Sequence, residues 1–238
     1  MGRAFEYRKA RKMKRWASMA KAFTKIGREI AIAVKEGGGD PEYNPRLRLA
    51  INNAKAANMP KANVDSAIKR ALSKDAANYD EVVYEGYGPK GVAVMVETAT
   101  DNTNRTVASM RLIFSKGGGN LGNSGEVDYM FTRKGQFKIA AEGRDVEELE
   151  LELIDHGLDE LKQEEDELVL MTAFEDFGNM QKALEDMGIE VSNAELVRIP
   201  SHTKKLDDEG EEAMIKLIDK LEEDDDVVNV FHNMDMEE

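Results

Sequence analysis

The residues with the clearest chemical capability lie near the N-terminus, where cationic side chains follow one another at short intervals. Glu6 is the only acidic residue before Glu29, so these positive charges repel one another unless an anion neutralises them. Phosphates neutralise such a cluster and release condensed counterions on binding. Phe5, Tyr7 and Trp16 are interleaved with the cations. The cationic residues of this basic arm are Arg3, Arg8, Lys9, Arg11, Lys12, Lys14 and Arg15.

The basic arm favours nucleic acid as its partner over the alternative, an exposed helix that charge keeps soluble. No base-reading motif such as a zinc finger is recognisable, so we expect recognition of the phosphate backbone and of shape. Cationic side chains further along are expected to extend the nucleic-acid-binding surface. They are Lys21, Lys25, Arg28, Lys61, Lys69 and Arg70.

The distribution of charge supports this interpretation, although the chain of 238 residues carries a formal net charge of −14. Residues 1–78 hold 18 Lys and Arg against 7 Asp and Glu, residues 79–140 hold 7 of each, and residues 141–238 hold 8 against 33. Screening beyond about 8 Å at physiological salt lets the basic segment present its own field. Three charge zones indicate three structural units.

Patterns for catalysis or metal binding are not recognisable. The chain has no cysteine, which excludes disulfides, thiolate nucleophiles and thiolate zinc sites. His156, His202 and His232 fall in different expected elements, without a matching nucleophile pattern. The acidic run 222–226 lacks the spaced ligands and central glycine of an EF-hand loop, so we expect a solvated acidic turn. We expect no metal, no cofactor and no enzymatic activity; a hydrolase that uses the acidic domain is the alternative.

Two stretches match the dinucleotide-binding pattern G-x-G-x-x-G, at residues 86–91 and 117–122. In that motif a helix N-terminus follows the loop and holds the pyrophosphate, whereas a strand is expected after each of these stretches. A nucleotide site is therefore not expected. Lys90 and Lys116 in these loops could instead contact phosphates of a large partner.

A further polar segment, residues 100–105, is dense in hydrogen-bonding groups. We interpret it as a capped helix start with Arg105 in the first turn, and the alternative is a contact surface for a partner. The sequence does not separate the two. The possible partner-contact residues, with the two lysines of the glycine-rich loops, are Lys90, Asp101, Asn102, Asn104, Arg105 and Lys116.

The elements that must position the cationic residues are helices. Apolar residues at spacings of three and four, from Trp16 to Val34, predict one long helix that the glycines at 37–39 end. Asn44 and Pro45 predict the N-cap and first turn of a second helix.

A third and a fourth helix are expected next along the chain. Pro60 starts the third, whose apolar stripe from Val64 to Leu72 faces inward. A later helix, capped at 101–102, carries inward-facing apolar residues. These are Val107, Met110, Ile113 and Phe114.

Beyond residue 78 the apolar pattern changes to that of strands. Residues 82–85 and 92–98 are expected to form a hairpin, and residues 127–131 a further strand. From residue 136 the expected order is strand 136–140, helix 146–156, strand 158–162, strand 167–173, helix 176–187 and strand 191–199. This β-α-β-β-α-β order is that of a ferredoxin-like unit.

The ferredoxin-like unit is complete without the last helix, expected at 211–221, and the last strand, expected at 227–232. The middle unit, which begins at residue 79, still lacks elements. We therefore expect the third unit to be inserted into the second. The predicted fold class is α+β with three domains. They are a basic helical nucleic-acid-binding domain at 1–78, an α+β domain formed by 79–133 and 203–238, and an inserted ferredoxin-like α+β domain at 134–202.

The sequence also suggests where the protein acts. No apolar run approaches the roughly 20 residues that a membrane helix needs. Residues 1–15 lack the apolar core of a secretory signal. We expect a cytoplasmic protein without a membrane partner.

Several segments of the chain, taken together and in order, resemble the YebC/PmpR family of bacterial proteins, which includes the mitochondrial translational activator of cytochrome oxidase. The similarity covers nearly the full length. One departure is that many members begin with Gly-His-Ser-Lys-Trp, whereas residues 2–7 here are Gly-Arg-Ala-Phe-Glu-Tyr, so contacts of that His and Ser are not carried over. The matching segments are residues 44–50, 58–61, 84–89, 100–105 and 114–122.

The resemblance implies a helical first domain, two α+β domains and a non-enzymatic regulator. Members are described as DNA-binding transcriptional regulators, and others as translation factors that act on ribosomes, including those stalled at proline-rich stretches. Our first hypothesis is a DNA-binding transcriptional regulator that contacts the phosphate backbone. The alternative is a ribosome-associated translation factor whose basic arm meets ribosomal RNA. No small-molecule substrate is expected.

Overall fold

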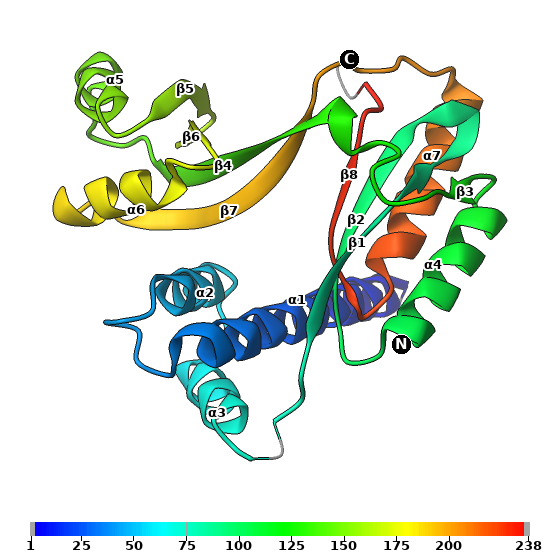
Figure 1. Cartoon of the computed structure of the whole chain (residues 1–238), viewed down its shortest axis with the longest axis horizontal. Coiled ribbons are helices and arrows are strands. Elements are labelled where there is room, and N and C mark those ends of the chain that lie inside the picture. Colours follow the sequence, from blue (N-terminus) through cyan, green and yellow to red (C-terminus); the bar gives the residue numbers. More distant parts are fainter. Residues whose placement is uncertain (1–2, 75, 236–238) are drawn as a thin grey trace. The chain divides into compact units, whose positions relative to one another are not determined.

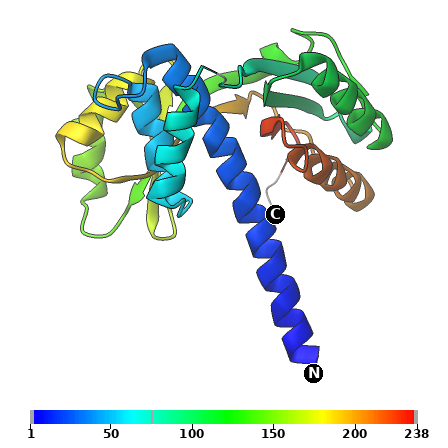
Figure 2. The same ribbon diagram turned by 90° about the horizontal axis from the view of Figure 1, so that it is seen from below.

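The chain begins with three helices in the computed structural model, which describes residues 3–74 and 76–235, with side chains from Ala20 onward. They are α1 (Arg3–Gly37), α2 (Pro45–Ala56) and α3 (Lys61–Ala71), coloured blue to cyan in Figure 1. Helix α1 extends well past α2 and α3 on its N-terminal side (Figure 2). The basic arm therefore belongs to a continuous helix, and Gly2 lies outside the described residues.

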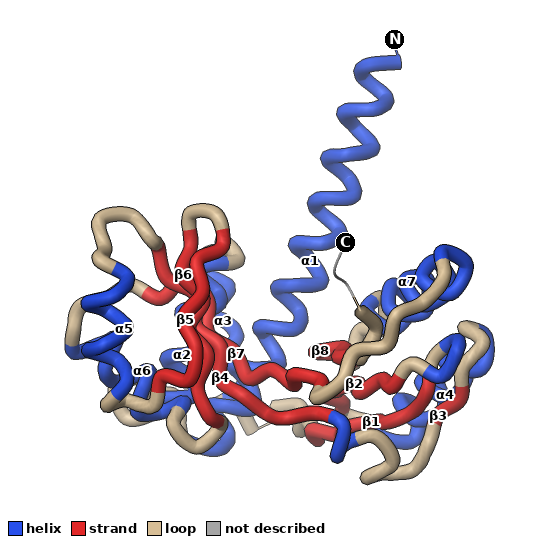
Figure 3. The backbone as a smooth tube through the Cα atoms, turned by 90° about the horizontal axis from the view of Figure 1, so that it is seen from above, coloured by secondary structure: helices blue, strands red, loops and turns tan. Residues whose placement is uncertain are grey.

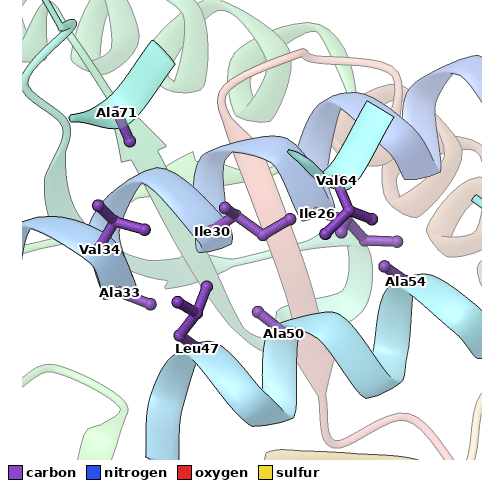
Figure 4. Packing of buried hydrophobic residues seen from close by; sticks show 9 residues of the cluster. All are labelled: Ile26, Ile30, Ala33, Val34, Leu47, Ala50, Ala54, Val64 and Ala71. Carbon is purple, nitrogen blue, oxygen red and sulfur yellow. The ribbon is translucent and has the colours of Figure 1, made fainter. Parts of the chain in front are cut away.

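The three helices share one small hydrophobic core (Figure 4). Of the predicted apolar stripe on α1, Ile26, Ile30 and Val34 turn to this core, as the periodicity predicts. Phe23, also predicted to face inward, is half-buried and is not part of the core. Trp16 and Met19, also predicted to face inward, lie outside the described side chains. The buried members of the core are Ile26, Ile30, Ala33, Val34, Leu47, Ala50, Ala54, Val64 and Ala71.

Asn44 fixes the start of α2, as predicted. Its side-chain oxygen accepts a hydrogen bond from the Leu47 amide at 3.0 Å, and Pro45 occupies the first turn. The Asn44 amide nitrogen donates to the carbonyls of Ala33 and Gly38 at 2.7 and 2.8 Å. Asn44 is buried. Its one side chain caps the start of α2 and also provides hydrogen-bond donors for backbone carbonyls at the C-terminal end of α1.

The prediction that Leu72 faces inward is wrong. Helix α3 ends at Ala71, and Leu72 is its C-cap with 62 % of its surface exposed. Its side chain lies against Gly39, where an added Cβ would come within 2.8 Å of Leu72 Cδ1. The helix ends one residue before the apolar pattern does.

The first four-stranded sheet has the order β3-β1-β2-β8. Its strands are β1 (Asp80–Tyr87), β2 (Ala93–Thr100), β3 (Asn120–Leu121) and β8 (Val227–His232). β1 and β2 are neighbours, as the predicted hairpin requires, and the short 3-10 helix η1 (Pro89–Gly91) lies between them in the chain. Helices α4 (Thr103–Lys116) and α7 (Asp208–Glu222) lie beside each other along the sheet (Figure 1).

The strand predicted at 127–131 is not observed. A 3-10 helix η2 (Asp128–Met130) occupies that position, and β4 (Phe131–Ala140) begins where the expected strand would end. The amides of Val127 and Asp128 donate to the Glu85 carboxylate at 2.8 and 2.9 Å, so they are not available to a strand ladder. The strand predicted at 136–140 is the second half of β4.

The second four-stranded sheet is antiparallel with the order β5-β6-β4-β7. Its other strands are β5 (Leu158–Glu164), β6 (Glu167–Ala173) and β7 (Val191–Pro200). Helices α5 (Val146–Ile154) and α6 (Phe177–Asp186) lie on one face (Figure 3). The predicted β-α-β-β-α-β order of elements is therefore confirmed, with strand and helix ends shifted by a few residues.

The second sheet is buried on both faces at its centre. On the helix face, Phe137 stacks on Phe177 with ring centroids 4.6 Å apart. A Cβ on Gly135 would come within 2.5 Å of Phe177 Cδ2, which explains a glycine in the middle of β4. The opposite face carries Val169, Met171 and Val197, against which Phe231 of β8 packs.

The chain divides into two compact units. The helical unit comprises Met1–Val82, Thr98–Thr103 and Glu223–Val228, and the sheet unit comprises the remaining segments. The protein is thus α+β, with an N-terminal three-helix region and two four-stranded antiparallel sheets with helices. Within the described ranges, no helix is long and apolar enough to cross a membrane.

Candidate nucleic-acid interface

The seven cations of the basic arm all lie in α1, and their side chains fall outside the described ones. The helical backbone still fixes how these positions are distributed. Positions 8, 11, 12 and 15 are separated by three or four residues and therefore fall on one face of the helix. The helical periodicity thus gathers four of the seven predicted contact residues on a single stripe.

Two of the predicted contact residues further along α1 are engaged inside the helical unit. Arg28 has only 14 % of its side chain exposed, and its Nη1 lies 3.0 Å from Asp226 Oδ1. The same nitrogen donates to the carbonyls of Ala99 and Asp225 at 2.8 and 2.5 Å. Lys25 Nζ donates to the Val228 carbonyl at 3.3 Å. Arg28 and Lys25 thus tie α1 to the ends of β2 and β8.

The acidic run 222–226 is not the fully solvated turn that the sequence predicts. Asp226 is buried with 5 % exposure, and Thr100 Oγ1 donates to its Oδ2 at 3.1 Å. The positive charge of Arg28 compensates the buried carboxylate, which would otherwise be costly to desolvate. The sequence does not reveal this burial because Arg28, the partner of Asp226, is 198 residues away in the chain.

The cations predicted on α3 are available to a partner. Lys61, Lys69 and Arg70 are exposed. Within the described part of the chain, none of these three side chains forms a hydrogen bond or ion pair. Lys21 on α1 is half-buried and likewise makes no such contact there. Among the predicted contact residues of the helical unit whose side chains are described, these four are therefore the ones available to phosphates.

A groove of about 560 Å³ lies between α1 and α3 in the helical unit. Phe23 and Arg28 line it from α1, Arg70 lines it from α3, and Tyr79 lines it from the segment before β1. The guanidinium carbon of Arg28 lies 5.4 Å from the centroid of the Tyr79 ring. The groove thus combines aromatic side chains with positive charge.

The two glycine-rich stretches meet at the edge of the first sheet. Gly86 pairs with Leu121 and Tyr87 with Asn120 across β1 and β3. A Cβ on Gly119 would come within 2.3 Å of the Tyr87 carbonyl oxygen, so this glycine permits close backbone approach. The first stretch is followed by β2 and the second contains β3, so neither has the strand–loop–helix arrangement of a dinucleotide site.

The lysines of these loops are exposed. Lys90 has a positive φ of 58°, and its Nζ lies 3.5 Å from Asp207 Oδ2. Lys116 ends α4 and makes no hydrogen bond or ion pair with the described residues. Lys90 thus lies within the first glycine-rich stretch, and Lys116 directly precedes the second.

The polar segment 100–105 is the start of a helix, as predicted. Helix α4 begins at Thr103, which places Arg105 in its first turn. Thr100 is buried, and its hydroxyl oxygen accepts a hydrogen bond from the Asn102 amide at 3.0 Å. The possible partner-contact residues of this segment are all exposed. They are Asp101, Asn102, Asn104 and Arg105.

The histidines do not converge on a site. His156 and His202 are exposed in separate segments of the sheet unit. Burial lowers the pKa of His232, whose Nδ1 is enclosed without a hydrogen-bond partner among the described atoms. Among the residues that the structure describes, no three His, Asp or Glu residues are grouped in a way that could hold a metal ion.

Glu85 is a structural residue that the sequence analysis did not single out. Its carboxylate accepts hydrogen bonds from the amides of Gly125, Val127 and Asp128 at 2.7 to 2.9 Å. It thereby holds the segment between β3 and β4, next to the glycine-rich loops. The available sequence signal was an acidic residue directly after the apolar run of residues 82–84, in the strand expected at 82–85.

The chain matches two family models of known proteins, which together cover most of its length. Residues 3–74 match the model of the TACO1/YebC protein N-terminal domain, and residues 79–234 match that of the TACO1/YebC second and third domain. The chain belongs to the TACO1/YebC family. The resemblance noted in the five sequence segments is therefore confirmed.

Relatives of this TACO1/YebC chain cover its full length. A "Probable transcriptional regulatory protein" of Porphyromonas gingivalis is 58 % identical over 239 residues, covering 100 % of this chain and 99 % of the relative. A protein of the same description from Anaeromyxobacter dehalogenans is 51 % identical, covering 98 % of this chain and 100 % of the relative. These descriptions name regulators and indicate no enzymatic activity.

A solved structure shares the fold of this TACO1/YebC chain. The crystal structure of a conserved hypothetical protein from Aquifex aeolicus has a TM-score of 0.81 and 42 % sequence identity. The match covers 92 % of this chain and 91 % of that one. The two proteins therefore share the arrangement of helices and sheets over almost their whole length.

We expect Glu85→Gln to lower the free energy of unfolding by about 2 kcal/mol at pH 7, because three charge-assisted hydrogen bonds are weakened. Burial alone would raise the pKa of Glu85, but the three amide donors, with the charge of Arg198, lower it below the ordinary value of 4.5. The stability that Glu85 contributes is present above pH 4.5 and is lost as the pH falls through its lowered pKa in the folded protein.

Denaturant titrations of the wild type and the variant from pH 7 down to pH 3 measure this effect. The difference between them should shrink as the pH falls below 4.5. The matched control is Glu190→Gln, because Glu190 is exposed and forms no hydrogen bond or ion pair with the described residues. A deficit for Glu85→Gln that is constant with pH would contradict the role of its charge.

Proposed function

We propose that this protein is a non-enzymatic, DNA-binding regulator of transcription that contacts the phosphate backbone through cations of α1 and α3. One observation carries the proposal: α1 is a continuous helix of 35 residues whose N-terminal part extends past α2 and α3. Residues 3–19 of that helix hold seven Lys and Arg against one acid. A charged helical segment that extends past the neighbouring helices is free to meet a polyanion.

The dimensions of the helix fit duplex DNA. Residues 3–15 span roughly 18 Å at 1.5 Å per residue. Over that length the duplex carries on the order of ten phosphates. The major groove is wide enough to admit an α-helix. Lys61, Lys69 and Arg70 are exposed on α3 of the same unit and add further cations to the proposed surface.

The relatives support this assignment by their descriptions, which name them probable transcriptional regulatory proteins. Such a role requires access to DNA, so we propose a cytoplasmic protein. We also retain the three-domain division at 1–78, 79–133 with 203–238, and 134–202. It is supported by β8, which belongs to the first sheet but follows all strands of the second sheet along the chain. The inserted domain is then ferredoxin-like.

A second candidate function is that of a ribosome-associated translation factor. The observation that favours it is the pairing of the two glycine-rich stretches across β1 and β3. This pairing brings the exposed Lys90 and Lys116 to the β3 edge of the first sheet. Backbone amides beside lysines suit the phosphates of a large RNA partner. Asp101, Asn102, Asn104 and Arg105 are then further candidates for contact.

A competition experiment separates the two functions. The purified protein is offered ribosomes and labelled duplex DNA together at physiological salt, and its partition is measured by sedimentation. Retention on DNA, with an affinity that falls steeply as salt rises, is the result expected from the transcriptional function. Transfer to the ribosomal fraction would assign the protein to translation instead.

A further inference from the structure

The groove between α1 and α3 has the size of a ligand site. Its volume of about 560 Å³ lies in the range of roughly 300–1,000 Å³ typical of small-molecule pockets. Its floor carries small residues, among them Gly27, Ala31 and Ala67. A Cβ added to Gly27 would meet no atom within 4 Å, so open space lies directly above this position.

The aromatic side chains of the groove suit a planar ligand. Phe23 and Tyr79 both line it and are partly exposed. The guanidinium of Arg28 lies over the Tyr79 ring, and Arg28 is itself held by Asp226. The Tyr79 ring is therefore supported on one side. Bases of nucleic acids stack on such aromatic side chains without regard to sequence.

The polar side chains of the groove offer both donors and acceptors. Those of Asn63 and Arg70 make no hydrogen bond within the described residues. The hydroxyls of Thr24 and Ser66 donate to the carbonyls of Ala20 and Ala62, which leaves their oxygen lone pairs as acceptors. An amide and two hydroxyl acceptors match the edge of a base, and an arginine matches a phosphate.

We propose that this groove binds one unstacked nucleobase together with its phosphate, from a nucleic-acid strand that the basic arm holds. The base lies against Phe23 and Tyr79, Asn63 meets its edge and Arg70 contacts its phosphate. This inference rests on the proposed nucleic-acid-binding function and adds to it a preference for strands with an unpaired nucleotide. Recognition of an extruded base in a protein pocket is an established strategy for reading nucleic acid.

The test compares two labelled duplexes that differ by one extrahelical nucleotide. Fluorescence anisotropy of the full-length protein at physiological salt gives both dissociation constants. We expect the bulged duplex to bind about tenfold more tightly, as one stacked base contributes. 2-Aminopurine at the bulge reports the environment of the base directly through its fluorescence.

Gly27→Met extends a side chain into the groove from a position where the added Cβ meets no atom within 4 Å, and methionine is a better helix former than glycine. We expect it to remove the preference for the bulged duplex and to leave the affinity for the regular duplex within about twofold of the wild type, because the basic arm is intact. The matched control is Gly178→Met in α6, a helical glycine that also has open space above it. This control should retain the preference.

The outcomes are distinguishable. Equal binding of the two duplexes by the wild type, or a preference that survives Gly27→Met, would overturn the inference and leave the proposed function standing. Failure to bind either duplex would overturn the proposed function together with the inference. Titration with free 5′-mononucleotides covers the other source of the same chemistry. Saturation at micromolar concentration that Gly27→Met abolishes would assign the groove to a free nucleotide and overturn the strand proposal.

Discussion

Replacing Arg8, Arg11, Lys12 and Arg15 together by alanine is expected to weaken duplex-DNA binding by about 100-fold or more at physiological salt. These positions share one face of α1, so the variant removes a whole stripe of positive charge. Each phosphate contact that is lost reduces the magnitude of the negative slope of log K against log salt by about 0.9. Four lost contacts should therefore reduce the magnitude of this slope by about 3.6.

Fluorescence anisotropy with a labelled duplex, repeated at several salt concentrations, measures both quantities. The matched control exchanges Arg8, Arg11 and Arg15 for lysine, which keeps every charge in place. If the phosphate backbone is the target, this control should retain most of the affinity. An alanine variant with unchanged affinity and salt slope would show that the basic arm is not the nucleic-acid contact.

Local sequence signals predicted most of the fold. The Asn44–Pro45 pair gave the start of α2 because a cap depends on neighbours within three residues. The alternating and helical periodicities from residue 136 onward gave the element order of the second sheet. Residues 227–232 could be assigned to the first sheet because the second was already complete.

The errors come from interactions between residues far apart in the sequence. The strand expected at 127–131 is replaced by a 3-10 helix because Glu85, some forty residues earlier, binds its amides. The acidic run at 222–226 looked solvated because Arg28, the partner of Asp226, lies at the other end of the chain. Periodicity and capping rules describe neighbours along the chain and do not detect such pairs.

In the candidate site, too, local sequence signals predicted some features, whereas others depend on residues far apart in the sequence. Composition alone located the basic arm, and helical periodicity placed Lys61, Lys69 and Arg70 on the exposed side of α3. The groove beside Arg70 could not be predicted, because its wall includes Tyr79, which belongs to neither helix. A pocket depends on which segments meet in space.

Asp226→Ala is expected to lower the free energy of unfolding of the helical unit by about 3 kcal/mol. The substitution leaves Arg28 as a largely buried charge whose ionic partner is missing, and it removes the acceptor of the Thr100 hydroxyl. Denaturant unfolding at pH 7 measures the loss. The matched control is Asp225→Ala, because Asp225 is the exposed neighbour and its contact with Arg28 uses the backbone carbonyl.

A double-mutant cycle with Arg28→Met tests whether the ion pair itself causes this loss. Removing both charges eliminates the uncompensated cation, so the double variant should be more stable than Asp226→Ala alone. Strictly additive losses would show that Arg28 and Asp226 contribute independently. The same Arg28→Met protein, while folded, should retain its duplex-DNA affinity, because Arg28 is used within the helical unit and the cations of the basic arm are unchanged.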